Sequence, residues 1–439
     1  MENPDSHTPN ERLRDLLKEA QWTGDALAKS INALGAENGL SLHYRRPSVA
    51  QWLAGSVPRP PVPQLITEAF SRRLGRLVTA EDAGLSKTRQ TLSVRPSQVA
   101  LQLAWLGDQQ PETGGSHIYS MPLLESLIEA LSSNEAIPPR PENADRRIGA
   151  SEISAATAAL SLFSSAEQIF GGGRIRPAIS TYLATTIAPW LQRPSSPTIN
   201  RRLLSLAASM SYLSAFSHYD DQNNGTAQRY YACSLQLALA ANDTASIALS
   251  LRGISVQAHA LGHRRKALQA AEAAQQHSRN GAPLLRAAIF GQQAVTAASV
   301  GDARQAAAYL LAAEHYLNQA SAASEPVGVY HLSSFAHQQA EAAALLGDYG
   351  PAEAALHEAI RRRPPIERRS HILTLHKLAD LQLAQGNLEA ACATWQDFLK
   401  GYPYITSGRV DAAYSTMRAR LKPFKNFPKV DSILRQPTC

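Results

Sequence analysis

The sequence predicts an all-α fold with a small helical head at the N-terminus and a long array of helical hairpins behind it. The apolar residues are mainly alanine and leucine and only 6% of the chain is aromatic, which favours closely packed helices. Short helical patterns separated by turn signals fill the N-terminal part, and four glycines recur at long intervals in the second half. At 439 residues the chain exceeds the size of a single hydrophobic core, so two or more domains are expected.

The domain boundaries follow from the pattern of turn residues and hydrophobic periodicity. Residues 1–10 have no such periodicity and are expected to form a flexible tail. We expect the head over residues 11–106 and a linker with one short helix over residues 107–146, where glycine and proline are frequent. The hairpin array is expected over residues 147–420, followed by a basic C-terminal tail over residues 421–439.

Two segments of the head have the pattern of a helix-turn-helix. Thr23-Gly24-Asp25-Ala26-Leu27-Ala28 opens the first helix, and the second runs from Pro47 to Gly55, a glycine suited to a left-handed C-cap. The expected shared core consists of Leu27, Ala28, Val49 and Trp52. These segments resemble the Cro/repressor-type fold, in which the first helix carries Leu-Ala and the second ends in an aromatic residue or leucine before the closing glycine. The connection from Leu34 to Arg46 is longer than the tight turn of that family.

A helix of this kind reads DNA bases from its N-terminal end in the major groove. With Val49 and Trp52 inward, Arg46, Ser48 and Gln51 face outward, where Arg46 suits guanine and Gln51 suits adenine. The residues expected to contact phosphates, which position the protein without reading sequence, are Thr23, His43, Tyr44, Arg45 and Arg59. Residues 40–80 contain six basic residues and a single acidic one, Glu68, within a chain of net charge +7. This basic excess is compatible with a double-stranded DNA partner.

The second half of the chain contains an internal repeat. Four glycines each precede a polar residue after a helical run: Gly262, Gly301, Gly347 and Gly386. Five residues after them lie Ala267, Ala306, Ala352 and Ala391, seven before the last three lie Ala294, Ala340 and Ala379, and twelve after lie Ala274, Ala313, Ala359 and Phe398. This register resembles the tetratricopeptide repeat, in which small residues mark where two antiparallel helices touch. An earlier hairpin is expected from Ile199–His218 and Thr226–Ala241.

The whole chain also resembles a group of actinobacterial (Streptomyces-type) regulators of sporulation and antibiotic production. The resemblance rests on Tyr44-Arg45-Arg46 before the second helix, on Trp52-Leu53-Ala54-Gly55 at its end, and on Phe170-Gly171-Gly172-Gly173 with the later Tyr182-Leu183. It implies a helix-turn-helix head ahead of degenerate tetratricopeptide repeats, and transcriptional control of development or specialised metabolism.

Stacked hairpins form a concave groove lined by the first helix of each pair. The repeat register places in this groove Arg252, Val256, His259, Gly291, Val295, His337, Glu341, His376 and Asp380, and the earlier hairpin would add Tyr212 and Phe216. We expect Tyr212, Phe216, Arg252, His259, His337, Glu341, His376 and Asp380 to contact a ligand, which is a signalling peptide, a small molecule or a partner protein. Two alternatives stay open: these polar groups face water or pair with each other, or the array serves mainly for dimerisation.

No catalytic constellation, metal site or cofactor motif is found. Gly171–Gly173 lacks the Lys-Ser/Thr of a phosphate-binding loop and is expected to be a turn. His259 and His263 have metal-ligand spacing but no third ligand. The three cysteines, Cys233, Cys392 and Cys439, form no CxxC motif, which favours a reducing compartment.

The N-terminus lacks the pattern of a signal peptide and no apolar run is long enough to span a bilayer, so a cytoplasmic location without a membrane partner is expected. The sequence therefore predicts a non-enzymatic, sequence-specific DNA-binding regulator that acts as a homodimer on an operator. The alternative is an adaptor or scaffold that recruits a partner protein without binding DNA.

Overall fold

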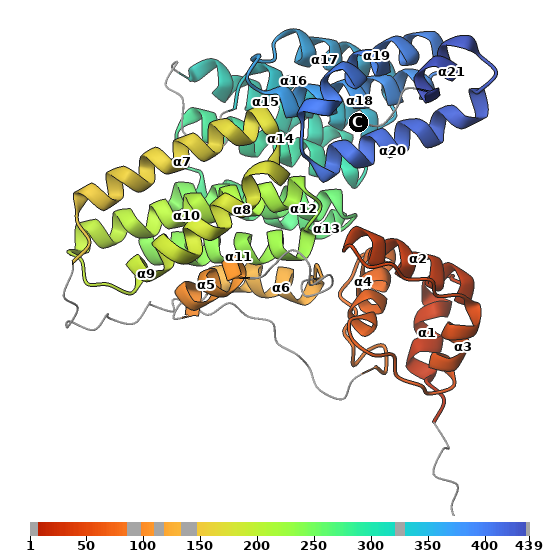
Figure 1. Cartoon of the computed structure of the whole chain (residues 1–439), viewed down its shortest axis with the longest axis horizontal. Helices are drawn as coiled ribbons and strands as arrows, with labels where there is room; N and C mark the ends of the chain where they lie inside the picture. The colour runs from red at the N-terminus through yellow and green to blue at the C-terminus, as the bar shows by residue number, and fades with distance from the viewer. Residues whose placement is uncertain (1–7, 86–97, 109–117, 133–146, 321–329, 436–439) are drawn as a thin grey trace, which may run out of the picture.

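The computed structural model describes residues 8–85, 98–108, 118–132, 147–320 and 330–435, and within these ranges it contains helices and no β-strand (Figure 1). The predicted all-α fold is confirmed. None of the helices in these ranges combines the length and the apolar character needed to cross a lipid bilayer.

The head contains four helices around its own hydrophobic core. They are α1 (Glu11–Glu19), α2 (Gly24–Glu37), α3 (Arg46–Leu53) and α4 (Val62–Leu74). The four predicted core residues Leu27, Ala28, Val49 and Trp52 are at most 4% exposed, so the expected contact between α2 and α3 is confirmed. Thr23 begins α2 by accepting a hydrogen bond from the amide of Ala26, the usual role of an N-cap hydroxyl.

The N-terminal boundary of the head differs from the expectation. Asn10 was expected in a flexible tail, but its Oδ1 accepts a hydrogen bond from the amide of Leu13 and so caps α1. Its Nδ2 donates to the carbonyl of Ala83 at 2.9 Å, and its own amide donates to the carbonyl of Leu53. Asn10 therefore joins three parts of the head. Residues 1–7 of the expected tail lie outside the described residues.

The C-terminal boundary of the head is also earlier than expected, because its hydrophobic core ends at Leu85. Helix α5 (Val99–Asp108), which the sequence analysis assigned to the head, packs against α8, α11 and η3 of the hairpin array. Its Val99, Leu103 and Leu106 are buried in the core of that array. Three apolar side chains on one helix face need a partner surface, and the array supplies it.

The short helix expected in the linker is present as α6 (Met121–Glu129), followed by the 3-10 turn η2 (Ala130–Ser132). It is docked on α11 and α13 and not free in solution. The side-chain amide of Gln228 forms two hydrogen bonds with the backbone of Ser120, at 2.9 and 2.8 Å, and fixes the start of α6. The remainder of the expected linker, 109–117 and 133–146, lies outside the described residues.

The array consists of antiparallel hairpins preceded by α7 (Ala150–Phe170), α8 (Gly172–Tyr182), the π-helical turn η3 (Leu183–Ile187) and α9 (Ala188–Leu191). The hairpins are α10–α11 (Pro197–Asp220 and Asn224–Ala241), α12–α13 (Thr244–Ala260 and Arg264–His277), α14–α15 (Pro283–Ser299 and Ala303–Gln319), α16–α17 (Leu332–Leu345 and Tyr349–Arg361) and α18–α19 (Arg368–Ala384 and Leu388–Gly401).

The predicted repeat register is confirmed at the turns and at the helix crossings. Gly262, Gly301, Gly347 and Gly386 all adopt positive φ between 82° and 88°, a backbone conformation that glycine adopts without strain. The alanines that recur at fixed distances from them, together with Phe398, are at most 2% exposed. Small side chains at these crossings let the two helices of each hairpin pack closely.

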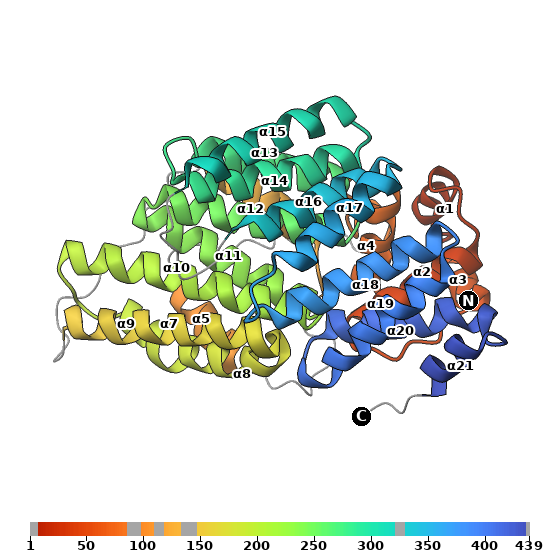
Figure 2. The ribbon, with the colours of Figure 1, turned by 90° about the horizontal axis from the view of Figure 1, so that it is seen from above.

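The array curves back so that its first and last parts meet (Figure 2). Helix α7 contacts α18, and the amide of Gly173 donates to the carbonyl of Thr406 while the amide of Thr406 donates to the carbonyl of Phe170. A side chain at Gly172 would place its Cβ 2.5 Å from the carbonyl oxygen of Ser217. The glycine-rich segment is thus the predicted turn between helices. It permits the close backbone approach that brings the first and last parts of the array into contact, so that the array forms a ring.

The C-terminal residues expected to form a basic tail are folded over most of their length. Helix α20 (Gly408–Leu421) is followed by the 3-10 turn η5 (Lys422–Phe424) and by α21 (Pro428–Arg435). Val430 and Ile433 of α21 are at most 1% exposed and complete the core formed with α19 and α20. The basic residues of this segment therefore lie on and around a packed helix, and the expectation of a tail is wrong for residues 421–435.

Candidate functional site

The first candidate site is the outer surface of the head around α3. Of the eight residues predicted to contact DNA, six are exposed, namely Thr23, His43, Arg45, Arg46, Gln51 and Arg59. Tyr44 and Ser48 are half-buried. The structure thus brings the N-terminal end of α3, the start of α2 and the loop after α3 to the surface of one small domain.

The start of α3 is held in place by the segment that precedes it. The side chain of Asn32 in α2 accepts a hydrogen bond from the amide of Tyr44 and donates to its carbonyl, both at 2.9 Å. The ring of Tyr44 also packs edge-on against Trp52, with centroids 5.2 Å apart. Gly35 makes room for this connection, because a Cβ there would lie 2.6 Å from Leu42. These contacts fix the long α2–α3 connection.

The basic side chains of this surface differ from several other arginines of the head, which form ion pairs. Among the described residues, no carboxylate forms an ion pair with Arg45, Arg46 or Arg59. By contrast, Arg72 binds Glu68 and Glu37, and Arg76 binds Glu19. The positive charge near α3 is therefore not neutralised within the domain.

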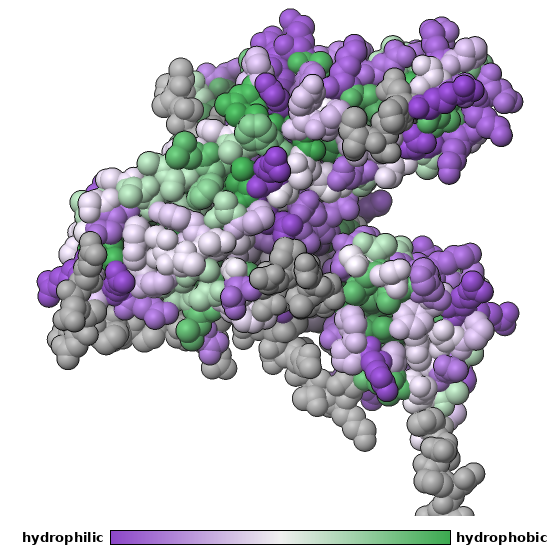
Figure 3. All heavy atoms as spheres, in the orientation of Figure 1, coloured by the Kyte–Doolittle hydropathy of each residue, from purple (hydrophilic) through white to green (hydrophobic). Residues whose placement is uncertain are grey.

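Helix α3 lies on the outer side of the head, and α4 lies between it and the array (Figure 1). Figure 3 shows hydrophilic residues along this outer edge and an open notch between the head and the C-terminal helices. Nothing in the described part of the array covers the predicted DNA-contacting residues, since all of them keep solvent exposure.

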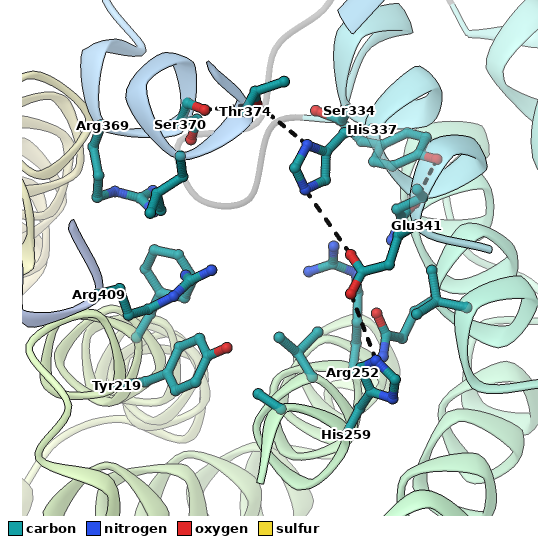
Figure 4. A pocket seen from close by; sticks show the side chains of 18 of the residues that line it. Tyr219, Arg252, His259, Ser334, His337, Glu341, Arg369, Ser370, Thr374 and Arg409 are labelled. Atoms are coloured by element: carbon teal, nitrogen blue, oxygen red, sulfur yellow. Dashed lines mark hydrogen bonds and ion pairs between the residues drawn. The ribbon is translucent and has the colours of Figure 1, made fainter. Parts of the chain in front are cut away.

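The second candidate site is a cavity of about 650 Å³ inside the ring of hairpins. The inner helices α10, α12, α14, α16 and α18 contribute to its lining, and α7 and α20 close the remaining side. Figure 4 shows two facing walls, one with Tyr219, Arg369 and Arg409 and the other with Arg252, His259, His337 and Glu341. A volume of this size is in the range of small-molecule sites.

Six of the eight predicted groove residues line this one cavity: Tyr212, Phe216, Arg252, His259, His337 and Glu341. Val256 and Val295 line it as well, whereas Gly291 is covered by Gln338 and Tyr330.

The other two predicted residues, His376 and Asp380, do not line the cavity. Asp380 forms an ion pair with Arg420 of α20 at 3.0 Å, and the indole of Trp395 lies 3.5 Å from Nδ1 of His376. Burial, with the charges of Arg420 and Lys377, lowers the pKa of His376 to about 4. Helix α18 instead presents Ser370, Thr374 and Lys377 to the cavity.

Several lining residues were not predicted from the sequence. Tyr219 lies at the end of α10, Arg369 and Lys377 on α18, and Glu167 and Arg409 on helices outside the repeat. The predicted groove positions lie ten and six residues before each glycine, with His259 three before the first, and none of these unpredicted residues occupies such a position.

A carboxylate is held on the α16 wall beside a lysine and two histidines. Glu341 accepts from Lys377 at 3.0 Å and lies 3.5 Å from Nε2 of His259 and 3.9 Å from Nε2 of His337. Burial raises the pKa of Glu341, but Lys377 and the hydrogen bond with His259 outweigh this and hold it well below the usual range. Burial, together with Lys377 and two more distant arginines, lowers the pKa of His337 to about 3. At neutral pH the wall therefore carries an ionised Glu341 beside a neutral His337.

The opposite wall contains a buried cluster of charges. Nε of Arg369 lies 2.8 Å from Glu167, and its NH1 lies 3.4 Å from Asp220. Asp220 also accepts a hydrogen bond from the amide of Gly172 at 2.9 Å. Burial raises the pKa of Glu167 to about 7, against the attraction of Arg369 and with the repulsion of Asp220. The cluster joins α7, α10 and α18 at the point where the ring closes.

The head and the array meet at a buried hydrogen bond. Glu68 of α4 accepts from Arg72 at 2.9 Å and lies 2.6 Å from Nε2 of His263, in the turn between α12 and α13. Burial raises the pKa of Glu68, but His263 and Arg72 outweigh it and leave it lowered. The ring of Tyr119 stacks on His263 at 5.3 Å. His263 therefore binds the head, and His259 binds Glu341 of the cavity, so the two histidines serve different contacts.

Residues 13–86 match the family described as the SP15 N-terminal domain. The matched range coincides with the separate hydrophobic core of the head, which runs from Leu13 to Leu85. The comparison of the chain with curated proteins gave no match.

Proposed function

We propose that the chain is a sequence-specific DNA-binding regulator of transcription whose hairpin array senses a ligand. The observation that carries the proposal is the unpaired basic surface at the start of α3, where Arg45, Arg46 and Arg59 lie exposed without a carboxylate partner among the described residues. An exposed, uncompensated basic face of this kind attracts the phosphates of a duplex.

The roles of the residues on this face follow from their position. Arg46 and Gln51 project from α3 and would contact base edges, where a guanidinium fits guanine and a carboxamide fits adenine. Arg45 and Arg59 flank the helix and would bind phosphates on either side of the groove. Two such heads, one from each protomer of a homodimer, would bind two half-sites about one helical turn apart.

The contact between head and array offers a route from ligand to DNA. Gly262 and Arg264 line the cavity, and His263 between them binds Glu68 of the head. A ligand that shifts the α12–α13 turn would move His263 and alter how the head is docked. In this way occupancy of the cavity would change the relative position of two heads, on which binding to paired half-sites depends.

The experiment is selection of genomic fragments by the intact purified protein, followed by sequencing. The expected result is an enriched, pseudo-palindromic site. Gln51→Ala should change the preferred base at one position of each half-site, whereas Arg45→Ala should weaken binding to all sequences and lower the dependence on salt. Arg304→Ala, on an exposed arginine of α15, is the matched control and should change neither.

Absence of any enriched fragment would contradict the proposal and favour an adaptor that recruits a partner protein through the array. Equal and unselective losses for Gln51→Ala and Arg45→Ala would retain DNA binding but remove the assignment of α3 as the reading helix.

A further inference from the structure

The cavity inside the ring contains more positive than negative side chains. The charged lining residues are the cations Arg252, Arg264, Arg363, Arg369, Lys377 and Arg409, and the acids Glu167, Glu341 and Glu367. A site with this imbalance favours an anion, because solvent screens partly buried charges less than fully exposed ones.

Each of the three acids is already paired with one of the cations. Arg369 binds Glu167 at 2.8 Å and Lys377 binds Glu341 at 3.0 Å. Arg363 binds Glu367, also at 2.8 Å. These pairs leave Arg252, Arg264 and Arg409 as the source of the excess charge.

Two of the remaining arginines lie within the cavity walls, and neither has a carboxylate to itself among the described residues. Nε of Arg252 donates to the carbonyl of Ala288 at 3.2 Å, and within the described residues no carboxylate pairs with it. Arg409 packs over the ring of Tyr219 at 4.9 Å. Its nearest carboxylate is Asp220 at 3.9 Å, which Arg369 and the amide of Gly172 already occupy. Figure 4 places Arg252 and Arg409 on opposite walls.

The effect of this charge reaches across the cavity. The pKa of His337 on the α16 wall is lowered to about 3 by burial first, and then by Lys377, Arg363 and Arg409. Glu341 acts in the other direction but does not cancel them. The aromatic rings of Tyr212, Phe216 and Tyr219 give the same space an apolar surface.

We propose that the cavity binds a small organic anion, with a carboxylate or phosphate group bound between Arg252 and Arg409 and an apolar part against Tyr212 and Tyr219. Guanidinium groups bind both kinds of oxyanion through charge-assisted hydrogen bonds. A volume of about 650 Å³ admits a metabolite-sized molecule. This inference deepens the proposed function, because it names the class of ligand that the array would sense.

The test uses two fluorescent probes of nearly the same shape, anionic 8-anilinonaphthalene-1-sulfonate and uncharged N-phenyl-1-naphthylamine. They are titrated into the full chain, into Arg252→Gln/Arg409→Gln, and into the control Arg279→Gln/Arg304→Gln on exposed positions of the array. We expect the cavity variant to lose at least ~10-fold in affinity for the anionic probe, which is the effect of one charge-assisted hydrogen bond. Its affinity for the uncharged probe and both affinities of the control should stay unchanged.

Competition in the unsubstituted protein supplies a readout that does not depend on a variant folding. Citrate and inorganic phosphate are each added to the bound anionic probe, and displacement by one of them identifies the carboxylate or the phosphate source. Displacement by neither, or an unchanged affinity of the cavity variant for the anionic probe, would overturn the proposal, as would equal losses for both probes.

These measurements need no DNA, so a failure of DNA binding leaves their result intact. A cavity that binds the anion while DNA affinity stays the same with and without it would retain the site and remove the sensor role from the proposed function.

Discussion

The arginines of the head surface and the buried Arg369 of the cavity wall are held in opposite ways. Arg45, Arg46 and Arg59 are exposed and lack a carboxylate partner among the described residues, whereas Arg369 is buried and binds both Glu167 and Asp220. An exposed charge costs little to keep unpaired, but a buried one is tolerated only with compensation. The exposed, unpaired arginines of the head suit a large polyanion that approaches from solvent. The buried, paired Arg369 suits a rigid cavity wall, whose remaining net charge is small and matches a small ligand.

The largest effect should follow from removing the buried arginine. Arg369→Ala leaves Glu167 and Asp220 buried beside each other without their cation. We expect a loss of about 3–5 kcal/mol in the free energy of unfolding, measured by denaturant titration of the intact chain. Arg304→Ala, on an exposed position, should stay within about 0.5 kcal/mol. Equal small losses for both variants would remove the distinction between compensated and uncompensated arginines.

The exposed arginines should affect DNA binding and leave stability unchanged. For Arg45→Ala/Arg46→Ala/Arg59→Ala we expect a loss of about 100-fold or more in affinity for duplex DNA and a salt dependence that falls by about two to three in its logarithmic slope. Fluorescence anisotropy at several salt concentrations measures both. A triple variant at the exposed Arg265, Arg279 and Arg304 has the same change in net charge, and a similar loss in that variant would assign the effect to overall charge and not to α3.

The contact between the two regions should respond to its histidine. His263→Ala removes a hydrogen bond to the charged Glu68 and the stacking on Tyr119, which together contribute about 1.5–3 kcal/mol to docking of the head. Hydrogen exchange should accelerate at α4 and at the α12–α13 turn and stay unchanged in α18. His357→Ala, whose side chain is 61% exposed beside Glu353, is the control. Unchanged exchange at α4 would mean that the head is held by other contacts.

The smallest effect concerns pH. Burial raises the pKa of Glu167 from 4.5 to about 7 in the folded chain. The folded chain therefore binds this proton more tightly than the unfolded chain does. The resulting contribution to the free energy of unfolding is complete below pH 4.5 and is lost as the pH rises through 7. The unfolding free energy should therefore fall between pH 5 and pH 8, by an amount on the order of 1–3 kcal/mol. Glu167→Gln cannot ionise, so its difference from the unsubstituted protein should change with pH in that interval. A constant difference would show that Arg369 keeps Glu167 ionised throughout.

The features that were predicted correctly depend on short stretches of chain. The turns at Gly262, Gly301, Gly347 and Gly386 require a local backbone conformation, and the alanines around them are needed wherever two adjacent helices cross. The core of the head around Leu27 and Trp52 is local in the same sense, because α2 and α3 are neighbours in sequence.

The features that were missed depend on how the whole array curves. Arg369, Arg409 and Glu167 come together because the ring closes between α7 and α18, and no repeat register specifies that closure. His376 contacts Trp395 of α19 and Asp380 pairs with Arg420 of α20, so neither faces the cavity, and the repeat register does not specify the helix that follows the last hairpin. Helix α5 was assigned to the wrong domain for a similar reason, since its apolar face fits either core by sequence alone.

The most direct test of the central claim is cleavage of DNA by a reagent tethered to α3. Iron–EDTA is attached to Ala50→Cys, an exposed position of α3, in a chain carrying Cys439→Ser; Cys233 and Cys392 are buried. We predict cleavage confined to a few nucleotides in each half-site of the enriched fragment, and none from the same reagent at Arg304→Cys. Cleavage from position 304 with none from position 50 would contradict the claim that α3 enters the duplex groove.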